Sequence, residues 1–167
     1  MVVFKHFTLL GKDGEERKLK INEDDGNEVY LWRAKGNCGL LKNPYWKRCA
    51  KDEARGYFRI FVGKRYQLHR VCYYAHNPDW DIYDTSRDNQ IDHIDRNKSN
   101  NHISNLRQAT NSQNMENRNG KGYCYCNTHK RWFAHVQKDG KTYRKYCNTE
   151  EEAIETRRQL KEKYHTF

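Results

Sequence analysis

The chain of 167 residues has few apolar side chains and almost no proline. Hydrophobic residues make up 35% and the mean hydropathy is −1.25, which argues against one deep core and favours small modules with thin cores. With only 2 prolines, long rigid linkers are not expected. There is no apolar run of membrane length and no signal-peptide pattern, so we expect a cytoplasmic protein without a membrane partner.

The 6 cysteines lack the spacing of a zinc-binding module. No two of them form a Cys-x-x-Cys pair, which argues against a zinc ribbon or knuckle. We therefore expect reduced thiols, and we disfavour a disulfide between Cys38 and Cys49.

Aromatic residues and positive charge are both abundant. Aromatics reach 13%, too many for a disordered chain, and the formal net charge is +10. Such a charge is typical of nucleic-acid binders, although an inert basic surface gives the same total. Lys and Arg outnumber Asp and Glu in residues 1–66 and 121–167, whereas residues 67–120 are close to neutral. This distribution favours basic flanks that hold a polyanion around a central segment that acts on it.

Residues 1–64 predict a small, mostly antiparallel β unit. The pattern indicates strands around a turn at 11–14, at 29–32 and at 56–62, with a break at Asn43-Pro44. Residues 45–48 combine aromatic and basic side chains, so Lys47 and Arg48 are candidate DNA contacts. A core position for Trp46 is an equally open alternative.

Residues 65–120 carry the densest group of chemically active side chains. Apolar residues at helical spacing predict a helix over 67–77, stopped by Pro78. Its His69 is either structural, which we favour, or a ligand or phosphate contact, and Arg70 is a candidate DNA contact. A short strand ending in Asp92-His93, a polar loop, a second short strand at 103–107 and a helix beginning near Thr110 follow.

This arrangement of strand, loop, strand and helix suits one divalent ion. Phosphodiester hydrolysis needs an activated water, a polarised phosphate and a stabilised leaving oxygen. His93 offers a base near pH 7, and Asp92 offers a hard carboxylate ligand. Asn105 offers an amide oxygen that could fix the His93 tautomer, and Asn114 offers a second, neutral ligand.

Residues 121–167 predict a three-stranded antiparallel sheet packed on one helix. Strands are indicated at 123–126, 131–138 and 142–147, with Asp139-Gly140 as a two-residue hairpin turn. Thr149 begins a capping box that leads into a helix ending near residue 163. The residues expected to join helix and sheet are Trp132, Ala134, Val136, Ala153, Ile154, Leu160 and Tyr164. His135, Gln137 and Arg144 then fall on the open face, and the fold class is α+β.

The central residues resemble the HNH endonuclease motif in its His-Asn-Asn form, which has the ββα-metal fold of phage and intron homing endonucleases. The matching segments are Leu68-His69-Arg70-Val71, Ile91-Asp92-His93-Ile94-Asp95, Asn100-Asn101, Asn105-Leu106-Arg107, Thr110 and Gln113-Asn114. The resemblance implies His93 as general base, oriented by Asn105. It also implies Asp92 and Asn114 as ligands of one Mg²⁺ or Mn²⁺. Arg96 stands where the family often has glycine.

Residues 122–164 resemble the APETALA-type (ethylene-response-factor) DNA-binding domain. Gly122-Tyr123, Lys130-Arg131-Trp132, Phe133-Ala134 and residues 148–153 carry the resemblance, whereas Cys124 and Cys126 stand where arginines are expected. The resemblance implies a three-stranded sheet in the major groove. The candidate DNA contacts here are Lys130, Arg131, His135, Gln137, Lys141, Tyr143 and Arg144.

The sequence therefore predicts a metal-dependent, homing-type DNA endonuclease of a bacteriophage. Its expected partner is double-stranded DNA, without a small-molecule substrate, and it would act as a monomer or weak dimer. Three domains are predicted, at residues 1–64, 65–120 and 121–167. The alternatives are a non-catalytic, sequence-specific DNA-binding regulator and, further behind, a protein that binds or cleaves RNA.

Overall fold

The computed structural model describes residues 2–36, 39–118 and 120–165 and has an α+β fold, as predicted. The chain divides into two compact units, Met1–Gln108 and Ala109–Phe167. The predicted boundary near residue 64 lies inside the first unit. Cys38, one partner of the disfavoured disulfide, is outside the described residues. Among the described residues, no helix is long and apolar enough to cross a membrane.

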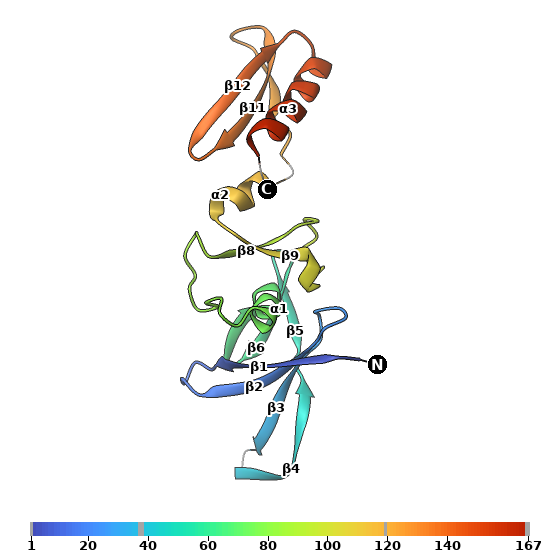
Figure 1. The fold of residues 1–167 in the computed structure, drawn as a ribbon, viewed down its shortest axis with the longest axis vertical. Coiled ribbons are helices and arrows are strands. Elements are labelled where there is room, and N and C mark those ends of the chain that lie inside the picture. The colour runs from blue at the N-terminus through green and yellow to red at the C-terminus, as the bar shows by residue number, and fades with distance from the viewer. Residues whose placement is uncertain (1, 37–38, 119, 166–167) are drawn as a thin grey trace. The chain divides into compact units, whose positions relative to one another are not determined.

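A four-stranded antiparallel sheet opens the first unit (Figure 1). Its strands, in spatial order, are β1 (Phe4–Leu10), β2 (Glu16–Asn22), β3 (Val29–Gly36) and β4 (Gly39–Arg48). Alternation places Leu19, Ile21 and Val29 on the buried face, each at most 2% exposed. The break predicted at Asn43-Pro44 is partly confirmed: β4 runs through it, but the register with β3 shifts between the pair of Lys35 with Leu40 and the pair of Arg33 with Tyr45, so Pro44 lies in an irregular stretch of the strand. As β4 is an edge strand, proline there need not remove a ladder hydrogen bond.

The helix α1 is the centre of the first unit. It follows a second sheet made of β5 (Lys51–Ala54), β6 (Tyr57–Val62) and β7 (Lys64–Gln67), and it spans Leu68–His76. Leu68, Val71 and Cys72 are fully buried, and the helix contacts β1, β6 and β7 as well as the strand β8. One hydrophobic cluster thus connects both sheets with the segment that carries the candidate site.

The candidate site lies on a short two-stranded sheet, β8 (Gln90–His93) and β9 (Leu106–Ala109). The prediction of one strand over 103–107 is partly wrong, because Ile103–Asn105 form a 3₁₀ turn, η1. The His102 side chain caps this turn by accepting from the backbone N–H of Ser104. Local capping therefore overrides strand pairing until Leu106.

The second unit contains α2 (Asn111–Glu116) and a three-stranded sheet covered by one helix. The sheet is made of β10 (Tyr123–Cys126), β11 (Arg131–Lys138) and β12 (Lys141–Cys147), and α3 spans Glu150–Tyr164. Both predicted capping residues are confirmed, since Thr110 and Thr149 each accept from a backbone N–H of the first turn.

The core of the second unit is small. Ala134, Val136 and Ala153 are at most 1% exposed. Asp139 and Gly140 both have positive φ, as a type I′ hairpin requires, so the predicted two-residue turn is confirmed. The prediction that Ile154 packs on the sheet is wrong, because this side chain is 48% exposed.

Candidate active site

Asp92 and His93 end β8, and both side chains are buried. Asp92 is 7% exposed and His93 is 4% exposed. Successive side chains on a strand point to opposite sides, so burial of both requires cover on each side of β8. The preceding Ile91 belongs to the hydrophobic cluster, and α1 contacts the strand. The pair is therefore held by packed secondary structure.

Arg107, on the neighbouring strand β9, holds the carboxylate of Asp92. Its Nε and Nη2 donate to Asp92 Oδ2 at 3.1 and 3.0 Å. The Arg107 side chain is 26% exposed, whereas that of Asp92 is 8% exposed. The ion pair thus compensates a buried negative charge and leaves part of the guanidinium at the surface. Reasoning from the sequence did not assign Arg107 a role, although its position on the partner strand was a usable signal.

The imidazole of His93 meets an amide from the following loop. His93 Nε2 and Asn101 Oδ1 are 3.1 Å apart, and Asn101 is 1% exposed. Two further rings contact His93, since the centroids of His69 and Tyr57 lie 5.0 and 6.0 Å away. The hydrogen bond to Asn101 and the aromatic neighbours therefore hold the ring.

Burial keeps both histidines of the site neutral. It lowers the pKa of His93, although the hydrogen bond to Asn101 and the charges of Asp92 and Asp95 oppose the shift. Burial, followed by the proximity of His93 and Arg70, lowers the pKa of His69 to about 3. A neutral His93 at pH 7 is the form that accepts a proton.

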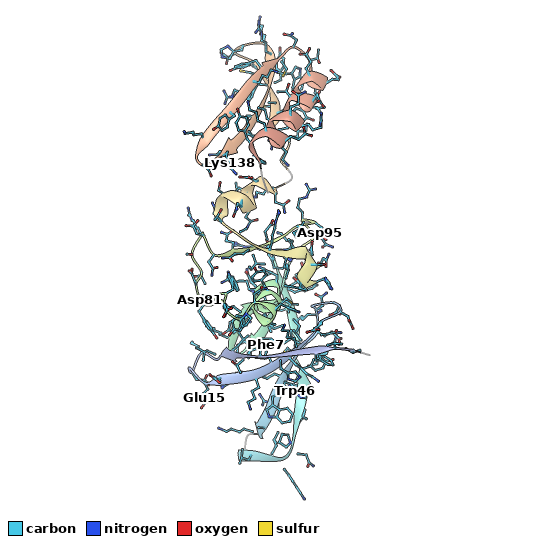
Figure 2. All side chains as sticks on the ribbon, viewed as in Figure 1. Phe7, Glu15, Trp46, Asp81, Asp95 and Lys138 are labelled. Carbon is cyan, nitrogen blue, oxygen red and sulfur yellow. The ribbon has the colours of Figure 1, made fainter. Side chains whose placement is uncertain are left out.

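Asn105 links the two ends of the loop between β8 and β9. Its Oδ1 accepts from the backbone N–H of Asp95 at 3.0 Å, and its Nδ2 donates to Asp95 Oδ1 at 2.9 Å and to the carbonyl of Asn100 at 2.8 Å. Its own carbonyl accepts from the N–H of Ile94 at 2.9 Å. Asp95 is labelled in Figure 2. Arg96 has a φ of 65°, the left-handed conformation that glycine adopts most easily, which agrees with glycine at this position in the resembling family.

The structure thus assigns the two asparagines differently from the sequence. Asn105 was predicted to accept from the His93 ring, and its side chain lies instead against Asp95 and Asn100. Asn101 meets the ring. The sequence offered Asn101 as part of the HNH-like segment Asn100-Asn101 but gave it no role, since loop asparagines are ordinarily interpreted as turn residues.

The predicted metal ligands lie in different compact units. Asp92 is on β8 of the first unit, and Asn114 is a half-buried residue on α2 of the second. Within the described ranges, no three His, Cys, Asp or Glu side chains gather as metal ligands. A carboxylate with an amide oxygen is a donor set that a hard divalent ion accepts, with its other positions taken by water and phosphate. The chemistry of these residues fits such an ion, and the ligand role of Asn114 stays a prediction.

The predicted DNA contacts of the first unit have different surroundings. Lys47 and Arg48 are exposed on β4, where Arg48 forms an ion pair with Glu28 at 2.5 Å. Arg70 instead donates to the backbone carbonyls of Ile82, Asp84 and Asn89. Arg70 therefore fixes the loop before β8, a role that its position after His69 did not indicate.

In the second unit, the predicted contacts divide between the two faces of the sheet. Arg131, His135 and Gln137 alternate with the helix-facing residues of β11, and Arg144 pairs with His135 across the strands. Tyr143 pairs with the buried Val136 and stacks on Tyr164 of α3, with centroids 3.9 Å apart, so it faces the helix. Lys130 lies in the turn before β11 and Lys141 begins β12; both are exposed.

Residues 66–116 match the model of the HNH endonuclease family. The matched segment runs from the end of β7 to the end of α2. It contains the predicted site residues Asp92, His93, Asn105 and Asn114. The match supports an HNH nuclease domain, a phosphodiester hydrolase that acts on nucleic acid, and such nucleases generally use a divalent metal ion. No curated protein and no solved structure matches the chain.

Proposed function

We propose that the protein is a metal-dependent endonuclease of the homing type that cleaves double-stranded DNA, with His93 as general base. The observation that carries the proposal is a buried, neutral histidine held by an amide oxygen beside a buried carboxylate, inside the segment that matches the HNH endonucleases. A bacteriophage origin is part of the proposal and rests on the resemblance of the motif alone.

His93 supplies the proton acceptor. Asn101 Oδ1 is an acceptor, so His93 Nε2 carries the ring proton and Nδ1 carries the lone pair. We assign to Nδ1 the proton of the attacking water. A positioned base of this kind contributes a factor of roughly 10² to 10⁴ in rate.

Charged side chains around His93 orient the phosphate and the ion. Asp92, held by Arg107, would bind the ion, and Asn114 is the second ligand that the resemblance implies. A bound Mg²⁺ or Mn²⁺ supplies polarisation of the phosphate and stabilises the leaving oxygen. The exposed Lys98 lies over the Tyr57 ring, 4.4 Å from its centroid, and adds positive charge near His93. One site of this kind cuts one strand, so a monomer nicks the duplex.

The open face of the first sheet supports DNA contact by the first unit. Lys20 lies over the rings of Phe4, Tyr30 and Trp46, at 4.1, 5.2 and 5.1 Å from their centroids. Trp32 packs against Trp46, which Figure 2 labels, on the face opposite to the buried Leu19 and Ile21. Aromatic and basic side chains together suit nucleic acid. Arg48 pairs with Tyr30 and shares this face, whereas Lys47 pairs with Leu31 and lies on the other face of the sheet.

The open face of the second sheet is our second candidate for DNA contact. Arg144 lies over the ring of Phe133, 4.5 Å from its centroid, and Arg131 and Gln137 share this face. The resemblance to the APETALA-type domain supports placing it in the major groove. If so, replacing Arg144 by alanine weakens DNA binding and reduces its dependence on salt, since phosphate contacts release counterions.

The test is cleavage of supercoiled plasmid with Mg²⁺ or Mn²⁺. The wild type should nick the plasmid, and EDTA should stop the reaction until the metal is restored in excess. His93→Gln should lower the single-turnover rate about 100-fold or more at unchanged DNA affinity. The matched control is His76→Gln, at the end of α1, which should cleave like the wild type.

Two outcomes would overturn the proposal. A folded wild type that binds DNA but is inert with every divalent ion tried would instead favour a DNA-binding regulator. Cleavage of folded RNA without cleavage of DNA would favour a ribonuclease. Equal rates for wild type and His93→Gln would remove His93 from the role of base.

A further inference from the structure

The amide of Asn101 has one possible orientation. Its Nδ2 faces two oxygen atoms, Asn27 Oδ1 at 2.9 Å and the backbone carbonyl of Ser99 at 3.5 Å. A backbone carbonyl only accepts, so the amino group must point to that side. Oδ1 therefore points to His93 Nε2, which must donate. The orientation of one buried amide thus determines which ring nitrogen of His93 holds the proton.

Asn27 comes from the turn between β2 and β3, far from the site in sequence. Its backbone N–H donates to Asp25 Oδ1, and its own Nδ2 donates to the carbonyl of Asp25. These two bonds turn Oδ1 of Asn27 toward Asn101. Local hydrogen bonds within the β2–β3 turn thus fix the orientation of the Asn27 amide that contacts Asn101.

The neighbouring Gly26 allows this turn to approach the loop closely. A Cβ at this position would lie 2.2 Å from the carbonyl oxygen of Asn101, and the residue has a φ of 62°. The Gly26 carbonyl also accepts from the thiol of Cys72 on α1 at 2.6 Å. The turn is therefore held between the central helix and the loop that carries Asn101.

We propose that Asn27 and Asn101 act as positioning residues that fix the orientation and the Nε2–H tautomer of His93, which makes the N-terminal four-stranded sheet part of the active site. The consequence for the reaction rests on the proposed role of His93 as base. The neighbouring rings of His69 and Tyr57 restrict the tilt of the imidazole, but ring contacts do not select a tautomer. The hydrogen bonds between Asn27 and Asn101 and between Asn101 and His93 restrict the tilt and also select the tautomer.

The direct test is the tautomer of His93 in the full-length protein labelled with ¹⁵N-histidine. Long-range ¹H–¹⁵N correlation distinguishes a protonated from an unprotonated ring nitrogen, and the signal that disappears in His93→Gln identifies the residue. The wild type should show protonated Nε2. Asn27→Ala should mix the tautomers. Asn27→Asp keeps an oxygen acceptor for Asn101 but loses the bond to the Asp25 carbonyl, so it should restore the wild-type pattern in part.

Kinetics provide the second measurement. Asn27→Ala should lower kcat about 10-fold, the usual scale for a residue that orients a functional side chain, with KM for DNA within about 2-fold of the wild type. Asn27→Asp should recover part of the loss. The matched control is Asn43→Ala, which removes an exposed asparagine of β4 and should leave both the tautomer and kcat unchanged.

The outcomes separate this inference from the proposed function. Protonated Nδ1 in the wild type, or an unchanged tautomer and kcat in Asn27→Ala, would overturn the inference even if DNA is cut. If the tautomer depends on Asn27 but no nucleic acid is cleaved, the positioning device stands and the proposed function fails. The wild-type spectrum alone decides the tautomer, so a poorly folded variant does not leave the question open.

Discussion

Each compact unit buries polar side chains, but the two units use different chemistry to do so. The first buries two histidines, two asparagines and one aspartate around a single loop, at His69, Asp92, His93, Asn101 and Asn105. The second buries Glu116, and an ion pair with Lys138, 2.8 Å long, compensates that charge. Lys138 is labelled in Figure 2.

The two sets of buried polar side chains have different roles. The ion pair between Glu116 and Lys138 joins α2 to β11, and we expect that apolar side chains can replace it without loss of the sheet. The amides of the first unit instead orient one another and a neutral imidazole, so each depends on the geometry of the next. A buried polar network that is fully matched specifies one arrangement, which is what a reacting side chain needs. Four changes test this contrast, beginning with the largest expected effect.

Gly26→Ala should be the most damaging of the four. Its Cβ would overlap the carbonyl of Asn101, and the positive φ adds backbone strain, so we expect a loss of roughly 3 kcal/mol in the free energy of unfolding. The matched control is Gly14→Ala, which has the same sign of φ but nothing within 4 Å, and should cost only about 1 kcal/mol. Urea denaturation measures both. Equal losses would mean that the turn does not press on the loop.

Lys138→Met should destabilise the second unit by removing the cation beside the buried Glu116. We expect Tm to fall by several degrees, less than in Gly26→Ala because Lys138 lies partly at the surface. The double variant Glu116→Leu, Lys138→Met removes both charges and should recover most of the loss. If the double variant is as unstable as the single one, packing rather than charge explains the effect. The tautomer of His93 should be unaffected by either variant.

Several local features were predictable from the sequence because their causes are local. The capping residues Thr110 and Thr149 and the Asp139-Gly140 turn depend on side chains within a few positions. Asp92 and His93 were found because they adjoin in sequence and carry distinctive chemistry. The contact between Asn101 and Asn27 was not predictable, since 74 residues separate the two. Only the packing of the first sheet on α1 brings them together.

A lower pH should reduce the stability of the first unit, because its buried histidines are neutral in the folded state. The folded pKa of His69, about 3, lies below the value near 6.5 of an unfolded histidine, so the unfolded chain binds the extra proton between these values. Stability is therefore complete above pH 6.5 and falls as the pH drops through this window. We expect a loss of about 1 kcal/mol between pH 7 and pH 5.5 from this residue.

Urea midpoints measured from pH 7 to pH 5.5 check this dependence. His69→Leu should flatten the dependence of stability on pH, while the lowered pKa of His93 leaves a smaller slope of the same sign. An unchanged slope in His69→Leu would show that His69 is not the group that titrates. The same substitution also removes a ring beside His93. Its effect on the tautomer therefore distinguishes the contribution of the ring contact from that of the hydrogen bonds of Asn27 and Asn101.

Arg158→Ala should have the smallest effect, although Arg158 forms ion pairs with two glutamates. It pairs with Glu155 and Glu162 on the surface of α3, where all three side chains are largely exposed. Solvent and salt screen such pairs, and ordering long side chains offsets their attraction. We therefore expect a Tm equal to that of the wild type within error, at both low and high salt. A clear drop at low salt would mean that surface charge stabilises the second unit more than its buried ion pair does. The contrast between the two units would then lie in their exposed charges, and the buried groups would no longer explain it.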